Sequence, residues 1–93
     1  MELSQLRIFM RVAETKSFSK TAHELFVSHS TVSRAVSSLE NELGVRLLMR
    51  DNAVKGLTPA GETLYKRAPE LIALADEIAE EIGSITSHRP SGE

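Results

Sequence analysis

The chain has 93 residues, of which 41% are apolar and 26% are charged, and it contains no cysteine. This length allows one small domain with an added helix, and it excludes a doubly wound α/β enzyme or a barrel. The absence of cysteine excludes disulfide-stapled scaffolds and thiolate metal sites, and it is compatible with a reducing compartment. No apolar run approaches the roughly 18 residues of a membrane span, and the N-terminal segment MELSQLRIFMR lacks the pattern of a signal peptide, so we expect no membrane association.

The net charge of −2 is unevenly distributed. Residues 1–67 contain ten Lys or Arg and seven Asp or Glu, whereas residues 68–93 contain one Arg and six acids. A mildly basic first part favours contact with a polyanion, and an acidic second part favours contact with water or with another protein. The alternative is an ordinary surface, since charge differences of this size also occur on surfaces that bind nothing.

Two short helices are expected first. Apolar residues recur at helical spacing over residues 3–14, which predicts one helix. Ser19 is expected to N-cap a second helix over residues 20–26, whose buried side would be Ala22, Leu25 and Phe26.

A third helix is expected after its N-cap Ser28 and ends near residue 43, where Gly44 supplies the left-handed C′ residue. Residues 47–50 and 55–57 flank a turn and predict a small β-hairpin. Thr58 and Pro59 are the expected N-cap and first residue of a fourth helix that runs to about residue 86.

The polar face of the third helix is unusual. Val32, Val36, Leu39 and Leu43 cluster on one side and predict its buried face. The opposite side carries short polar side chains and one arginine: Ser30, Ser33, Arg34, Ser37 and Asn41. Solvated helix faces are usually rich in Glu and Lys. Short side chains instead let a helix approach another surface closely, and Arg binds guanine or phosphate, so the pattern favours entry into the major groove of DNA. The alternative is a solvent face that happens to be rich in serine.

The neighbouring elements support the first interpretation. A short helix, a three-residue connection and an amphipathic helix make a helix-turn-helix, and a hairpin directly afterwards makes it winged. Arg50 and Lys55 flank the wing tip, where we expect contact with phosphate or the minor groove unless they are ordinary surface charges. The predicted fold class is mainly α: a winged helix-turn-helix (three helices plus a small β-hairpin wing) over residues 1–58, followed by a long linker helix over 59–86 and a flexible tail over 87–93.

The chain resembles the N-terminal DNA-binding domain of LysR-type transcriptional regulators over about residues 1–82. The matching residues are Phe9, Val12-Ala13-Glu14, Ser17-Phe18-Ser19, Thr21-Ala22, Leu25, Val27-Ser28, Ser30, Val32-Ser33-Arg34, Val36, Leu39-Glu40, Leu43-Gly44-Val45, Leu47-Leu48, Arg50, Leu57-Thr58 and Ala60-Gly61. The resemblance implies a homodimer through antiparallel linker helices, compatible with a tetramer in a full-length form, and a cytoplasmic, nucleoid-associated location in a bacterium. It also implies a C-terminal effector-binding domain, and we expect that domain and its small-molecule site to be absent from this chain.

The resemblance also implies which residues contact DNA. The family's contact positions at the start of the third helix fall on His29, Ser30, Thr31, Ser33 and Arg34; Lys20, Ser28, Ser37, Arg50 and Lys55 complete the predicted set. The family often has Gln-Pro where this chain has His29-Ser30, which bears on the base preference at those positions. It often has a second wing arginine where Ala53 stands, so we expect the minor-groove contact either to be weaker or to pass to Lys55. Pro69 removes a helical hydrogen bond to the Tyr65 carbonyl and predicts a kink in the linker helix.

No motif predicts catalysis, a cofactor or a metal site. His23, His29 and His88 form no i,i+4 pair and have no carboxylate in metal-ligand register. The adjacent Ser28 and His29 do not make a nucleophile–base geometry. We therefore expect no enzyme.

The linker helix carries an apolar heptad stripe. Its members are Leu64, Ala68, Leu71, Ala75, Ile78, Ile82 and Ile85. About 28 residues make a helix about 42 Å long, more than a small domain can cover, so we expect residues 64–82 of this stripe to form a dimer interface. The alternative is a helix packed entirely on its own domain.

Two functional hypotheses follow. The first is sequence-specific binding of double-stranded DNA by a dimeric transcription factor module, with residues 29–43 in the major groove and the wing, residues 50–55, on the backbone or minor groove. The second is a dimerisation or protein-interaction fragment with little affinity for DNA, for which the net charge of −2 leaves room.

Overall fold

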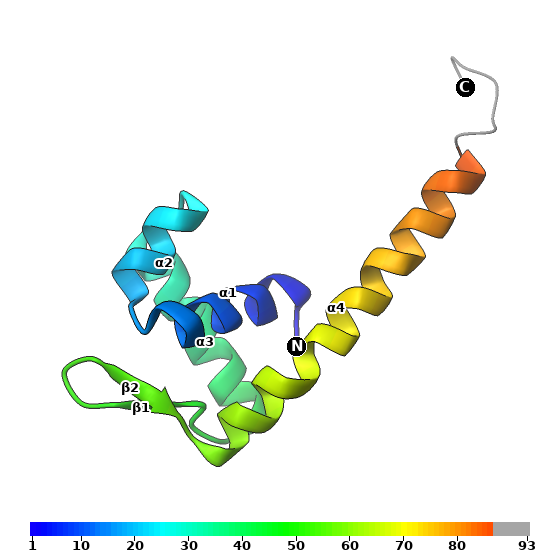
Figure 1. The fold of residues 1–93 in the computed structure, drawn as a ribbon. Helices are drawn as coiled ribbons and strands as arrows, with labels where there is room; N and C mark the ends of the chain where they lie inside the picture. The colour runs from blue at the N-terminus through cyan, green and yellow to red at the C-terminus, as the bar shows by residue number, and fades with distance from the viewer. Residues whose placement is uncertain (87–93) are drawn as a thin grey trace.

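The computed structural model describes residues 1–86 as three helices, a hairpin and one long helix, which is the predicted fold class (Figure 1). The elements in chain order are α1 (Leu3–Thr15), α2 (Phe18–Leu25), α3 (His29–Leu43), β1 (Leu48–Arg50), β2 (Val54–Leu57) and α4 (Pro59–Thr86). The first three helices pack together, the hairpin projects beside them, and α4 leaves the domain as a rod (Figure 1). The tail predicted over 87–93 lies outside the described residues.

The core fixes one face of α3 toward the interior. Its fully buried side chains come mainly from α1 and α3: Leu6, Phe9, Val12, Val32, Val36 and Leu39 are all 0% exposed. Leu47, Leu48 and Val54 extend the core to the hairpin. Each such side chain contributes about 1.5–3 kcal/mol when fully buried, so the opposite face of α3 is held toward solvent.

The start of α2 differs from the prediction. Ser17, and not Ser19, is the N-cap, because its hydroxyl accepts a hydrogen bond of 3.0 Å from the backbone N–H of Lys20. The Thr15 hydroxyl accepts from the Ser17 N–H at 3.2 Å and thereby holds the cap. Phe18 then becomes the first helical residue and packs against the core.

Three apolar residues predicted to be buried are exposed. Phe26 follows the end of α2 with a left-handed φ of 58° and is 94% exposed, and Leu25 is 37% exposed, so the predicted buried side of this helix reduces to Ala22. The chain reverses at Phe26 to reach α3, which takes its side chain out of helical register. Leu43 is 40% exposed and lines an open groove between the end of α3 and the start of α4.

Local signals set the ends of α3 and the start of α4 as predicted. The Ser28 hydroxyl accepts from the Thr31 N–H at 3.1 Å, and Gly44 ends α3 with a φ of 71°. The Thr58 hydroxyl accepts from the Gly61 N–H at 3.0 Å and donates to the Arg46 carbonyl at 2.6 Å.

The hairpin is antiparallel, with Leu48 opposite Leu57 and Met49 opposite Gly56. The register shifts between Met49 and Arg50, where a bulge turns the end of β1. The Asp51 N–H then donates to the Ala53 carbonyl at 3.1 Å and closes the wing tip.

The first part of α4 packs on the domain and the rest extends beyond it. Ala68 is 2% exposed, the Tyr65 hydroxyl donates to Glu14 of α1 at 2.6 Å, and Arg7 pairs with Asp76 at 3.3 Å. The helix is continuous through Pro69, and the predicted kink stays a prediction. Within residues 1–86, no helix combines the length and apolar character needed to cross a bilayer.

Candidate nucleic-acid interface

The first turns of α3 carry a connected row of exposed hydroxyl groups. The Ser28 hydroxyl lies 3.1 Å from that of Ser30 and 2.9 Å from that of Thr31. The Arg34 guanidinium donates to the Ser30 hydroxyl at 3.2 Å. These four predicted residues therefore share one exposed face, and the row holds the Arg34 side chain along it.

The remaining serine and asparagine residues of α3 are exposed or half-buried, and one of them contacts α1. Ser37 and Asn41 are exposed and Ser33 is half-buried. Ser38 accepts a hydrogen bond of 3.2 Å from Gln5 of α1, so it belongs to the packing between these helices. The polar face lies where the sequence predicts it, and its contacts with DNA stay a prediction.

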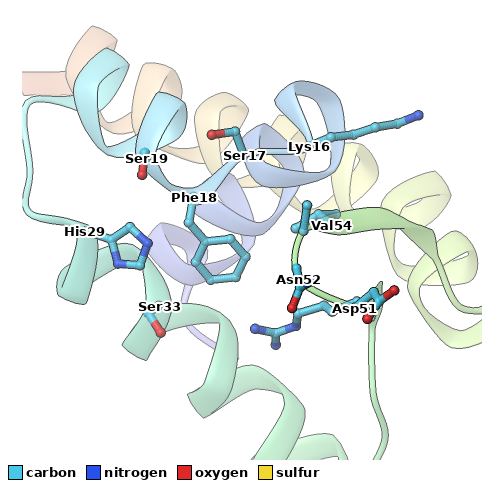
Figure 2. Close-up of a pocket in the computed structure, with 11 residues that line it drawn as sticks. Lys16, Ser17, Phe18, Ser19, His29, Ser33, Asp51, Asn52 and Val54 are labelled. Atoms are coloured by element: carbon cyan, nitrogen blue, oxygen red, sulfur yellow. The ribbon is translucent and has the colours of Figure 1, made fainter.

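An open cavity of about 350 Å³ lies where α2, α3 and the wing meet. Lys16, Ser17 and Ser19 line it from the start of α2, His29 and Ser33 line it from α3, and residues 50–54 line it from the wing. Figure 2 shows the Phe18 ring pointing into this cavity between His29 and the wing residues Asp51 and Asn52. The fold thus brings Arg50 of the wing to the same cavity as His29 and Ser33 of α3, and all three are predicted site residues.

Arg50 is turned toward the protein. Its guanidinium donates to Oε1 of Glu40 at 3.0 Å and lies 5.1 Å from the centre of the Phe18 ring. The Arg50 side chain is 29% exposed and that of Glu40 is 8% exposed. Glu40 Oε2 also accepts from the Leu47 N–H at 2.8 Å.

Sequence reasoning missed Glu40 as part of this site. The available signal is its position four residues after Val36 and eight after Val32, inside the apolar stripe of α3. An acid at such a position is rarely buried unless a cation pairs with it.

The cations without an acid partner lie mostly at α2, α3 and the wing. Arg7, Arg11, Arg46, Arg50 and Arg67 all pair with acids. Among residues 1–86 the lysines and arginines without an ion pair are Lys16, Lys20, Arg34, Lys55 and Lys66. All but Lys66 belong to α2, α3, the wing or the segment before α2. Of these cations, Lys16 lines the cavity and Arg34 lies on the hydroxyl-rich face.

The predicted dimer stripe on α4 is exposed only in its outer part, and its role in a dimer stays a prediction. Ala68 is buried by its own domain and is not available to a partner chain, and Leu64 is half-buried against the domain core. Leu71, Ile78 and Ile82 are 41%, 48% and 56% exposed. Ala75 is half-buried. Leu74, which the prediction omitted, is 53% exposed on the same helix.

Residues 1–86 contain no group of three or more His, Asp or Glu side chains placed to hold a metal ion. His88 lies outside this range.

Comparison with known proteins identifies the family. Residues 3–62 match the family described as bacterial regulatory helix-turn-helix protein, lysR family. The chain is 40% identical over 85 residues to the HTH-type transcriptional regulator BudR of Raoultella terrigena, covering 91% of this chain and 29% of that protein. It is 47% identical over 68 residues to the HTH-type transcriptional activator IlvY of Haemophilus influenzae, covering 73% and 23%.

Among solved structures, the chain is similar to the BenM DNA-binding domain in complex with catB site 1 DNA, with a TM-score of 0.84 and 36% identity. The match covers 97% of this chain and all of that one. The chain spans less than a third of the length of the two curated relatives described above. With the family match over residues 3–62 and the fold in agreement, the chain belongs to the LysR family of bacterial regulatory helix-turn-helix proteins.

Proposed function

We propose that this chain is the module through which a LysR-type transcriptional regulator binds a specific sequence of double-stranded DNA. The observation that carries the proposal is the exposed row formed by Ser28, Ser30, Thr31 and Arg34, whose arginine has no acid partner among residues 1–86. A helix with short polar side chains fits the major groove, and its arginine can donate two hydrogen bonds to guanine.

The residues divide into two roles. His29, Ser30, Ser33 and Arg34 read base edges, with Thr31, Ser37 and the N-cap Ser28 beside them, because they lie on or next to the exposed start of α3. Lys20 and Lys55 contact phosphates, because each is exposed and carries an unpaired charge. Phosphate contacts set the register of the protein on the duplex, whereas base contacts provide the sequence preference.

The proposed binding unit is a homodimer through α4. Leu71, Leu74, Ile78 and Ile82 expose apolar surface beyond the winged domain, and such a surface requires a partner. In a parallel pair the acids of residues 76–81 would face one another, whereas an antiparallel pair brings them toward Lys66 of the second chain. Each chain then presents one α3 to one half-site, as a two-fold dimer requires.

In this proposal the chain acts without catalysis, in the bacterial cytoplasm where the chromosome lies. The test is to select duplexes from a randomised library with this chain and then to measure the affinity for a selected duplex and for its scrambled version by fluorescence anisotropy. We expect the selected duplex to bind at least about tenfold more tightly. Equal binding of both duplexes would show DNA binding without sequence preference and would contradict the proposal. Binding of neither duplex would favour a fragment that serves only in protein–protein contact.

A further inference from the structure

Four side chains from three elements form a closed series of contacts around the cavity. Glu40 of α3 binds Arg50 of β1, Arg50 lies over the ring of Phe18 of α2, and that ring lies 5.8 Å from the His29 ring at an interplanar angle of 33°. Glu40 and His29 belong to the same helix, about three turns apart. The series therefore ties the wing and α2 to both ends of α3.

The buried carboxylate holds Arg50 in this series. A buried carboxylate is strongly destabilising unless it is paired and hydrogen-bonded, and Glu40 has two hydrogen-bond donors, the Leu47 N–H and the Arg50 guanidinium. Arg46 also lies near Glu40, but at 3.8 Å and with a side chain that is 75% exposed, so water screens this second pair. Contact of Arg50 with a DNA phosphate would leave Glu40 without its main cation.

We propose that Glu40, Arg50 and Phe18 are positioning residues for DNA recognition. They set the wing against α3 and fix the orientation of the His29 imidazole at the DNA-facing start of that helix, without touching DNA themselves. This inference rests on the proposed function, and it assigns to Arg50 a role other than the phosphate contact expected from its place on the wing.

The first test uses the chain without DNA. In a ¹H–¹³C NMR spectrum of the histidine rings, the His29 signals, assigned with a His29→Gln variant, are displaced by the Phe18 ring. We expect Arg50→Met and Glu40→Gln to move the His29 signals although neither residue touches the imidazole, and to leave the His23 signals in place.

The matched control for this test is Arg46→Met, which removes the other cation beside Glu40 and should leave the His29 signals unchanged. Arg50→Lys keeps the positive charge but loses the planar group over Phe18, so it should also move the His29 signals. This variant replaces Glu40→Gln in the test if Glu40→Gln fails to fold. His29 signals that stay unchanged in every folded variant of Arg50 and Glu40 would overturn the proposal.

The second test measures affinity for the selected duplex and its scrambled version as a function of salt. A positioning role predicts that Arg50→Met lowers affinity for the selected duplex about tenfold relative to the scrambled one and leaves the salt slope unchanged. A phosphate contact predicts equal loss on both duplexes and a slope reduced by about one, which would overturn the proposal.

Glu40→Gln distinguishes the two roles in the second test by whether affinity for DNA rises or falls. Removing an acid beside a polyanion strengthens binding to both duplexes if only charge matters, whereas a positioning role predicts weaker binding to the selected duplex. If the unmodified chain binds neither duplex, the proposed function fails while the NMR test of the contact series still stands.

Discussion

Arg34 donates a 3.2 Å hydrogen bond to the hydroxyl of Ser30, one helical turn before it on the exposed face of α3. The contact holds the guanidinium along the helix, and no acid neutralises Arg34 among residues 1–86. Less side-chain freedom is then lost when the arginine binds, because its conformation is already restricted.

Arg34→Ala should weaken binding to a selected duplex by roughly 1–3 kcal/mol and should weaken binding to a scrambled duplex less. The reason is that a base contact is lost only where the right base is present. Anisotropy titrations with both duplexes check this. Equal losses would make Arg34 a phosphate contact, and no loss on either would remove α3 from the interface.

Lys55→Met should weaken binding to both duplexes alike and reduce the slope of log affinity against log salt by about one, because one phosphate contact is removed. A slope that is the same for Lys55→Met and the unmodified chain would show that the wing stays away from the backbone.

Ile78→Glu should convert the chain to a monomer and abolish most sequence-specific binding, because a charge replaces a side chain in the proposed helix–helix contact. Ala73→Glu introduces the same charge on the opposite side of α4 and should leave the dimer intact. Sedimentation velocity of the unmodified chain and both variants is the measurement. If the unmodified chain is a monomer, the proposed dimer is wrong and α4 packs only on its own domain.

Gly61→Ala should destabilise the fold by about 1–3 kcal/mol. A Cβ atom at this position would lie 2.0 Å from the Leu47 carbonyl oxygen, so the start of α4 or the segment before β1 must shift. Gly83→Ala is the contrasting variant. A Cβ there has no atom within 4 Å, and the change should stabilise the helix by up to about 1 kcal/mol. Urea unfolding distinguishes the two, and a neutral Gly61→Ala would contradict the close approach.

Tyr65 should titrate above its ordinary pKa of 10.0, because its hydroxyl donates to the Glu14 carboxylate and the folded chain holds that proton more tightly. The hydrogen bond therefore stabilises the fold below about pH 10 and is lost as the pH rises through the folded-state pKa of Tyr65. Tyr65 is the only tyrosine and there is no tryptophan, so absorbance at the phenolate band reports it alone. Glu14→Gln should return the pKa toward its ordinary value; an unchanged titration would place the phenol away from Glu14.

Local chemistry in the sequence determined the elements and the polar face of α3. The Ser28 and Thr58 caps, the left-handed Gly44 and the spacing of Val32, Val36 and Leu39 all act within one or two helical turns, so the sequence displays them directly. The same spacing places Ser30 and Arg34 on the exposed face, and both were predicted correctly to lie there.

Only the tertiary structure decided which side chains meet across elements. Phe26 has the large apolar side chain that is typical of a core residue, but the reversal of the chain between α2 and α3 leaves it exposed. Ala68 lies in the heptad stripe, yet the winged domain covers it. Arg50 and Glu40 are ten residues apart on a helix and a bulged strand, and their pairing depends on the burial of Glu40. A buried charge pairs with whichever opposite charge the fold brings close to it, and the spacing of residues along the sequence does not give the distance between two side chains on different elements.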